Sequence, residues 1–205
     1  MKILSFLKAA CRHRMSLRNA LSSWTSLWSG DGVIDALGGL TKEEKDGLVD
    51  WIAAADARQV VEIGTLFGFT AREIVRRTRA KVTAVDNFCW NPFGMPPDTH
   101  ESFAREILAD FLADGRVELL RTDSARFFAS AADGRLKGAF VFLDGDHRYE
   151  AVRREIELVR KSGAAWIAGH DYGNPLFGVT RAVGEVFGKP DATAGMCWLK
   201  RLQET

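Results

Sequence analysis

Short apolar runs alternate with segments of helical periodicity along most of this chain. Repeated alternation of strands and helices predicts βαβ crossovers, because parallel neighbouring strands need a long connection between them. We therefore expect an α/β fold with a single, mostly parallel sheet and helices on both faces. A late apolar stretch predicts an additional edge strand. The apolar runs are 59–63, 81–85, 116–120, 139–143, 164–168 and 196–199, and examples of the helical segments are 71–79 and 149–161.

Thr41 and Glu44 mark the start of the domain's first helix. A Glu three residues after a Thr is typical of a capping box, and apolar residues then recur to about Ala55. We assign residues 1–40 to an amino-terminal extension and residues 41–205 to the domain. The first thirty residues contain five Lys or Arg and no acid, interleaved with Leu and Trp, which predicts a basic amphipathic helix. We expect it to pack on the domain or on a second copy in a homodimer, with peripheral membrane contact as the alternative.

Composition limits the classes of protein to which the chain can belong. With 205 residues, of which 46% are hydrophobic, it can bury one good core but is too short for two full-sized domains. The 28 basic and 27 acidic residues leave a net charge of +1, so we expect no nucleic-acid partner. Cys11, Cys89 and Cys197 form no CxxC pair, which favours a reducing, cytoplasmic location over a disulfide scaffold.

Two acids and an imidazole follow the apolar run 139–143. Asp144, Asp146 and His147 stand where a buried strand meets a turn, and the carboxyl end of a strand is where open α/β sheets bind ligands. This clustering indicates an enzyme. The alternative is that the Asp-Gly-Asp turn only caps the next helix.

The ends of the first two strands carry a similar signal. Glu62, Gly64 and Gly68 span a strand-to-helix turn, where glycine lets the backbone approach a ligand closely. The three-glycine spacing of a dinucleotide site is missing, which argues against a NAD(P)-linked oxidoreductase. Asp86 ends the second strand, where an acid can accept hydrogen bonds from two ribose hydroxyls.

Asp123 and Ser124 end the third strand, where an acid and a hydroxyl could form hydrogen bonds with the amino group of an adenine. Each acid alone could be a helix cap. Three successive strands that end in acids at one edge favour a ribose-containing cofactor over capping alone.

The motifs at these strand ends resemble those of a known family. VVEIGTLFGFTAREI, VTAVDNF, RTDSARFF, VFLDGDHRYEAVRREIELV and WIAGHDYGN are similar, in order, to the motifs of class I S-adenosylmethionine-dependent methyltransferases. The likeness is strongest to a small bacterial group with DGDHxYE and HDY motifs, and it covers about residues 59–183. It implies a Rossmann-like methyltransferase fold and S-adenosyl-L-methionine as the cofactor.

The resemblance also implies roles for individual residues. The first turn would line the methionine part of the cofactor, the second strand end would hold the ribose, and the third would lie by the adenine. An acid of the DGD motif would border the cofactor and, with the pair after the next strand, could bind a divalent metal. The cofactor residues are Glu62, Gly64, Thr65, Gly68, Asp86, Asn87, Asp123, Ser124 and Asp144, and the metal ligands would be Asp144, His170 and Asp171.

Methyl transfer to a hydroxyl needs alignment and removal of a proton. The resemblance makes Asp146 the candidate base, and His147 is the second candidate. If His170 does not bind a metal, it is either a base or a structural residue. His170 leaves the metal question open, since imidazole suits zinc, iron or manganese better than Mg²⁺, which prefers oxygen ligands. We expect O-methylation of a small hydroxylated metabolite or sugar. A NAD(P)-linked oxidoreductase and a non-catalytic interaction module are the rival interpretations.

Residues 87–100 are too long and too rich in proline and aromatics for a simple turn. Phe88, Trp90, Phe93 and Met95 could cover a ligand as a lid, or could anchor the loop to the core. We expect His100 at the surface, and we interpret the charged residues of 149–161, among them Glu155, as the solvated face of a helix.

Overall fold

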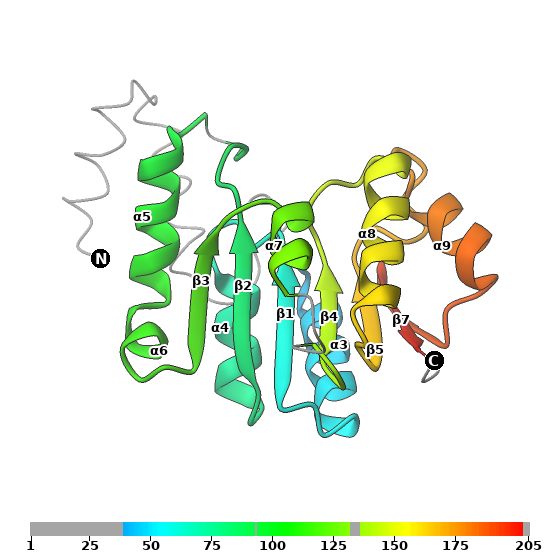
Figure 1. The fold of residues 1–205 in the computed structure, drawn as a ribbon, viewed down its shortest axis with the longest axis horizontal. Coiled ribbons are helices and arrows are strands. Elements are labelled where there is room, and N and C mark those ends of the chain that lie inside the picture. The colour runs from blue at the N-terminus through cyan, green and yellow to red at the C-terminus, as the bar shows by residue number, and fades with distance from the viewer. Residues whose placement is uncertain (1–38, 93, 132–135, 203–205) are drawn as a thin grey trace.

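The structure, a computed structural model, describes residues 39–92, 94–131 and 136–202 (Figure 1). Residues 1–38 lie outside this part of the chain, and so does Phe93. The amphipathic helix predicted in the extension 1–40 and its dimer or membrane contact therefore stay predictions.

A seven-stranded sheet forms the centre of the molecule, in the order β3-β2-β1-β4-β5-β7-β6. The first five strands are parallel, while β7 is antiparallel to both β5 and β6, which confirms the mostly parallel sheet. Strand β6 was missed because its three residues, Ala-Thr-Ala, carry no apolar run. The strands are β1 (Gln59–Ile63), β2 (Lys81–Asp86), β3 (Val117–Arg121), β4 (Phe140–Leu143), β5 (Trp166–Gly169), β6 (Ala192–Ala194) and β7 (Cys197–Arg201).

Helices cover both faces of the sheet, with α7 and α8 in front and α3 and α4 behind in Figure 1. Helix α8 has the predicted bounds. Helix α5 begins at Pro97, since proline suits the first turn of a helix. The helices are α3 (Lys42–Ala54), α4 (Phe69–Arg77), α5 (Pro97–Ile107), α6 (Ala109–Ala113), α7 (Ser124–Ser130), α8 (Tyr149–Lys161) and α9 (Val179–Phe187).

Alternation along the strands divides the core into two layers. Val60 of β1 and Phe140 of β4 pack with α3 and α4, while Val61 and Val141, one residue further on, pack with α7, α8 and α9. Each fully buried side chain of this size contributes about 2 kcal/mol. Central strands that are apolar on both faces are typical of a parallel sheet covered by helices.

The predicted capping box is present at the start of α3. The Glu44 backbone N–H donates to the Thr41 hydroxyl oxygen at 3.3 Å, and the Thr41 N–H donates to the Glu44 carboxylate at 2.8 Å. Glu44 is nevertheless only 2% exposed, and its other carboxylate oxygen accepts a hydrogen bond from the Met196 N–H at 2.8 Å. The cap therefore also ties α3 to the turn between β6 and β7.

Backbone atoms of β1 and β4 approach closely beyond their last residues. A Cβ at Gly64, whose φ is +90°, would lie 2.3 Å from the Asp144 carbonyl oxygen. Only glycine combines this backbone conformation with so little space.

Glu155 is buried between α7 and α8, so its assignment to a solvated helix face was wrong. The Ser124 hydroxyl donates to its carboxyl oxygen at 2.6 Å, and the residue is 4% exposed. Burial raises the pKa of Glu155 to about 7 from its ordinary 4.5, although the Ser124 hydrogen bond opposes the shift. The charged residues of α8 suggested a solvated helix face, but Glu155 among them faces α7.

In the described part of the chain, no helix is both long and apolar enough to cross a membrane.

We predict that Gly64→Ala lowers the free energy of unfolding by about 3 kcal/mol, because a clash adds to the strain of a positive φ. Denaturant unfolding measures the loss. Gly115→Ala is the matched control, since Gly115 has a φ of +73° but open space around its Cα, and it should cost only about 1 kcal/mol. Equal losses in the two variants would contradict the close approach.

We predict that Glu155 makes stability fall as the pH rises. A carboxyl whose pKa is higher in the folded than in the unfolded chain binds more protons when folded, so the free energy of unfolding decreases between about pH 4.5 and 7. Relative to Glu155→Gln, the wild-type protein should lose up to roughly 3 kcal/mol across this window. Denaturant unfolding at a series of pH values measures it, with Glu157→Gln on the exposed side of α8 as the control. Parallel curves for wild type and Glu155→Gln would contradict the prediction.

Candidate active site

The carboxyl ends of β1, β2, β4 and β5 lie at one edge of the sheet. β1 has β2 on one side and β4 on the other, so this edge is a topological switch point, where open α/β sheets bind ligands. Backbone pairing continues past the strand ends: the Gly64 N–H donates to Val85 O at 2.9 Å, and the Asp144 N–H donates to Ile63 O at 2.8 Å. By the general rule for open α/β sheets, the crevice of this switch point would lie outside the ends of β1 and β4, bordered by backbone held in these hydrogen bonds.

Asp86 presents a fixed carboxylate beside this crevice. One oxygen accepts the Leu66 N–H at 2.8 Å, and the other accepts the Phe88 N–H at 2.7 Å. The residue is still partly exposed, and each oxygen keeps a second lone pair. Asp86 can thus accept hydrogen bonds from two hydroxyls of a ligand without moving. The neighbouring Asn87 is exposed and accepts the Cys89 N–H through its side chain.

Glu62 lies inside the turn after β1. It is 1% exposed, and the Thr65 hydroxyl donates to its carboxyl at 2.9 Å. Burial, together with the nearby charges of Asp144 and Asp86, raises the pKa of Glu62 well above its ordinary value. Glu62 therefore stabilises the turn through a hydrogen bond inside it. Gly68 is the N-cap of α4 and has a φ of +83°. Contact of Glu62, Thr65 and Gly68 with a cofactor stays a prediction.

Asp123 is the N-cap of α7. Its carboxylate accepts the Arg126 N–H at 2.8 Å, so the capping role considered for this acid is real. The hydroxyl of Ser124 is directed to Glu155. Contact of Asp123 and Ser124 with adenine is not tested by this arrangement and stays a prediction.

His170 lies between two buried carboxylates. Its Nδ1 is 3.3 Å from Asp144 Oδ1, and its Nε2 is 3.3 Å from Glu44 Oε1. Burial opposes protonation, but the two carboxylates raise the pKa of His170 to about 10. Burial would likewise raise the pKa of Glu44, yet contacts with His170, Met196 and Thr41 lower it to about 2. Burial raises the pKa of Asp144, with His170 opposing the shift.

These contacts do not fit the metal site that the sequence left open. Both ring nitrogens of His170 lie 3.3 Å from carboxylate oxygens, and Asp171 Oδ1 accepts the side-chain N–H of Asn174 at 2.8 Å. Within the residues described, no group of three or more His, Cys, Asp or Glu side chains is arranged to hold a metal ion. The set Asp144, His170 and Asp171 therefore receives no support as a Mg²⁺ or Mn²⁺ site.

His147 forms a second pair with a carboxylate. Its Nε2 is 3.5 Å from Asp171 Oδ2, and its ring packs against Phe177 with centroids 4.9 Å apart. Asp171 is 6% exposed and has a φ of 59°, a left-handed conformation that few residues other than glycine adopt. The backbone is thus locally strained at Asp171, which lies next to both histidines.

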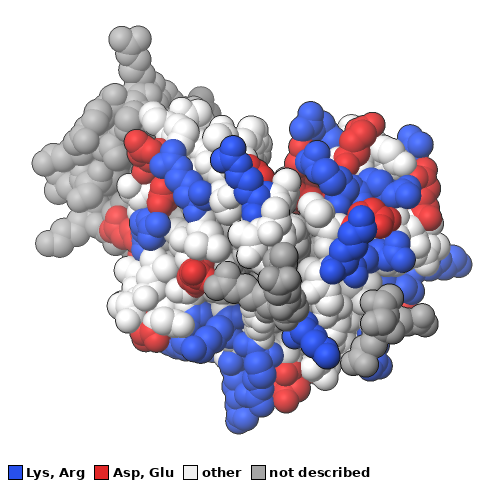
Figure 2. Space-filling view, in the orientation of Figure 1, with Lys and Arg blue, Asp and Glu red and all other residues white. Residues whose placement is uncertain are grey.

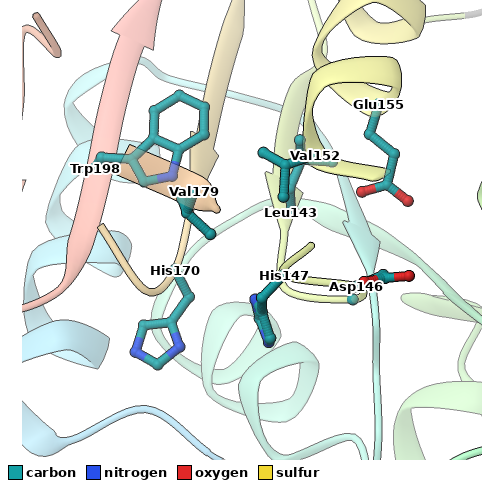
Figure 3. Close-up of a pocket in the computed structure, with 9 residues that line it drawn as sticks. Leu143, Asp146, His147, Val152, Glu155, His170, Val179 and Trp198 are labelled. Carbon is teal, nitrogen blue, oxygen red and sulfur yellow. The ribbon is translucent and has the colours of Figure 1, made fainter. Parts of the chain in front are cut away.

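Asp146 is directed away from these groups. In Figure 3, its carboxylate points away from His147 and His170, although all three residues line one pocket. The Arg148 guanidinium binds this carboxylate and holds the pKa of Asp146 below its usual range. A carboxylate with a lowered pKa is a weak base, so the geometry disfavours Asp146 in the role that the sequence gave it.

The aromatic loop is anchored to the core, while its role as a cover for a ligand is not tested by this arrangement and stays a prediction. Phe88 and Met95 are buried, and Asn91 closes the loop through two hydrogen bonds with the Met95 backbone at 2.9 Å. Trp90 is 70% exposed. The expectation that His100 lies at the surface was wrong, because His100 of α5 is completely buried.

Sequence reasoning missed two polar groups near this edge. Glu44 was recognised only as a cap residue, and nothing in its spacing from His170 indicates their contact. His100 carried a signal that could have been used, because it occupies an i, i+3 pattern with Phe103 on the buried face of α5.

Charges on the outer surface are largely paired. Figure 2 shows basic and acidic side chains side by side on the face formed by α8 and α9. There Glu185 accepts hydrogen bonds from Arg153 and Arg181, both at 2.9 Å.

Comparisons with known proteins agree on the family. A family model described as a methyltransferase domain matches residues 61–172, more than half of the chain. No curated protein matches the chain. Three solved structures illustrate the likeness in fold.

The cofactor-bound protein Rv0187 from MTB has a TM-score of 0.62 and 20% identity, over 91% of this chain and 89% of that one. The O-methyltransferase TomG from Streptomyces achromogenes, in complex with SAM, has a TM-score of 0.60 and 14% identity, over 80% and 82%. An O-methyltransferase from Bacillus cereus, in complex with SAH, has a TM-score of 0.56 and 15% identity, over 74% and 70%.

The family match covers the turn after β1, the acid at the end of β2 and the DGDH and HDY segments, and it leaves the NAD(P)-linked alternative without support. The mostly parallel sheet agrees with the fold of the solved structures. The chain belongs to the class I S-adenosylmethionine-dependent methyltransferases.

Proposed function

We propose that the crevice between β1 and β4 binds S-adenosylmethionine and that the enzyme methylates a hydroxyl of a small acceptor, a metabolite or a sugar. The observation that carries the proposal is the fixed, partly exposed carboxylate of Asp86 beside the Gly64 turn. Such a carboxylate suits the two hydroxyls of a ribose. TomG and the Bacillus cereus protein, which carry SAM and SAH, are both named O-methyltransferases and share this fold.

We place the acceptor on the other side of the crevice, next to β4 and β5. His147 and His170 line a small pocket there, of about 10 Å³, beside Leu143, Val179 and Trp198 (Figure 3). This volume is that of about one water molecule, so the pocket suits the hydroxyl of an acceptor rather than the whole molecule. Polar groups on an apolar wall fix the orientation of a small molecule. The near-neutral net charge of the chain favours such an acceptor over a polyanion.

His147 is the base in this proposal. Its Nε2 faces Asp171, while its Nδ1 forms no hydrogen bond or ion pair with a described residue and can accept the proton of an acceptor hydroxyl. A carboxylate behind a histidine fixes the ring orientation and stabilises the imidazolium that forms. Asp146, the first candidate from the sequence, lacks this arrangement because Arg148 binds its carboxylate.

Bound S-adenosylmethionine supplies a methyl group made electrophilic by its sulfonium. The chain has to hold the acceptor oxygen in line with this methyl and remove the proton as the new bond forms. His147 takes the proton on Nδ1 and shares the charge with Asp171 across 3.5 Å. His170, held between Glu44 and Asp144, keeps the Asp144 side chain in place beside the Gly64 turn.

We predict that S-adenosylhomocysteine binds the wild-type protein and that Asp86→Ala weakens the binding by about 100-fold, because charged hydrogen bonds to the ribose are lost. Isothermal titration calorimetry measures both dissociation constants. Asp114→Ala changes an exposed acid before β3, at the opposite edge of the sheet, and should leave the constant unchanged. Absence of binding to folded wild-type protein would remove the proposed function.

We predict that His147→Asn lowers turnover by a factor of roughly 10² to 10⁴, the usual contribution of a general base, without weakening S-adenosylhomocysteine binding. The assay is transfer of a labelled methyl group to a panel of sugars, phenols and other hydroxylated small molecules. Asp146→Asn should keep turnover within about threefold, since that acid only pairs with Arg148. The reverse ranking of the two variants would make Asp146 the base.

A further inference from the structure

His100 is a completely buried histidine that the proposed reaction does not use. It stands in the first turns of α5, and neither ring nitrogen forms a well-aligned hydrogen bond with a described residue. Burial lowers the pKa of His100, so the ring is neutral. Burying a polar group without full compensation costs about 1–3 kcal/mol, which a Phe or Leu in the same place would avoid. Packing alone therefore does not account for a histidine here.

Two strained turns lie next to this ring. Leu66, in the turn after β1, has a φ of 50°, and Phe88, in the turn after β2, has a φ of 57°. A left-handed conformation costs a residue with a Cβ roughly 1–2 kcal/mol and persists only when its surroundings hold it. These are the two residues whose N–H groups bind the Asp86 carboxylate.

His100 contacts both turns at once. Its ring meets the Phe67 ring edge-on at a centroid distance of 4.9 Å and the Phe88 ring at 5.0 Å. The nearby charge of Asp86, and after it the backbone of Phe88 and Leu66, favour the protonated form of His100 against the larger effect of burial. The imidazole thus packs against an aromatic side chain of each of the two turns that hold Asp86.

We propose that His100 is a positioning residue of the cofactor site. Its imidazole holds the Leu66 and Phe88 turns in their left-handed conformations, so that both N–H groups stay on Asp86 and its carboxylate stays directed at the ribose hydroxyls. The role of the N–H group of His100 is to attract a carbonyl oxygen of one turn, while the ring packs against both. This inference rests on the proposed binding of S-adenosylmethionine through Asp86.

The experiment compares His100→Phe, which keeps an aromatic ring but removes both nitrogens, with His100→Gln, which keeps an N–H donor. Phe103→Leu is the matched control, because Phe103 is buried one turn further along α5 and also packs edge-on against Phe67, at 6.4 Å. The first measurement is the position of the Leu66 and Phe88 amide resonances in NMR spectra of each protein without cofactor. The second is the dissociation constant for S-adenosylhomocysteine, measured at a temperature well below the melting temperature of each variant.

We expect His100→Phe to shift both amide resonances upfield, as their hydrogen bonds to Asp86 lengthen, and to weaken S-adenosylhomocysteine binding about tenfold. Turnover at saturating cofactor should stay within about twofold of wild type, because the acceptor side is untouched. His100→Gln should restore most of the affinity. Phe103→Leu should lower the melting temperature but leave the amides and the affinity as they are.

Unchanged amide resonances and unchanged affinity in folded His100→Phe would overturn the proposal. An equal loss of affinity for S-adenosylhomocysteine in Phe103→Leu would overturn it as well, because the effect would then come from loosening of α5. If His100→Phe does not fold, His100→Met makes the same comparison with an adaptable apolar residue. Failure of wild-type protein to bind S-adenosylhomocysteine would remove the proposed function, but the amide resonances would still decide whether His100 holds the turns.

Discussion

The close approach of β1 and β4 beyond their last residues is the constraint on which the rest of this structure depends. A Cβ at Gly64 would meet the Asp144 carbonyl oxygen at 2.3 Å, so the two strand ends can lie side by side only with glycine there. That approach fixes the Asp144 backbone against Ile63, and with it the start of the DGDH turn. The side proposed for the cofactor and the side proposed for the acceptor therefore share one edge of the sheet.

Two sets of polar contacts lie at this edge, and each fixes the position of an acidic side chain. Backbone N–H groups of Leu66 and Phe88 fix Asp86, while His170 joins Asp144 to Glu44. The second arrangement uses an imidazole between carboxylates, where a metal ion was one expectation. A chain with a net charge of only +1 can still concentrate charge locally in this way, because burial strengthens each interaction.

The sequence allowed the fold and the strand-end acids to be predicted, since apolar runs, glycines and strand ends are local signals. Helix α8 and the capping box at Thr41 followed from such signals, and so did the position of Asp86. The contact between Glu44 and His170 joins distant parts of the chain and has no local trace. His100 and Glu155 were misplaced because a polar residue on a buried helix face looks like any other polar residue.

The central claim is that the crevice between β1 and β4 binds the cofactor and that Asp86 holds its ribose. A crystal structure of the protein with S-adenosylhomocysteine tests it most directly. The account predicts both ribose hydroxyls within about 3 Å of the Asp86 carboxylate and the sulfur between the Gly64 turn and Asp144. Cofactor bound elsewhere, or ribose hydroxyls directed away from Asp86, would contradict it.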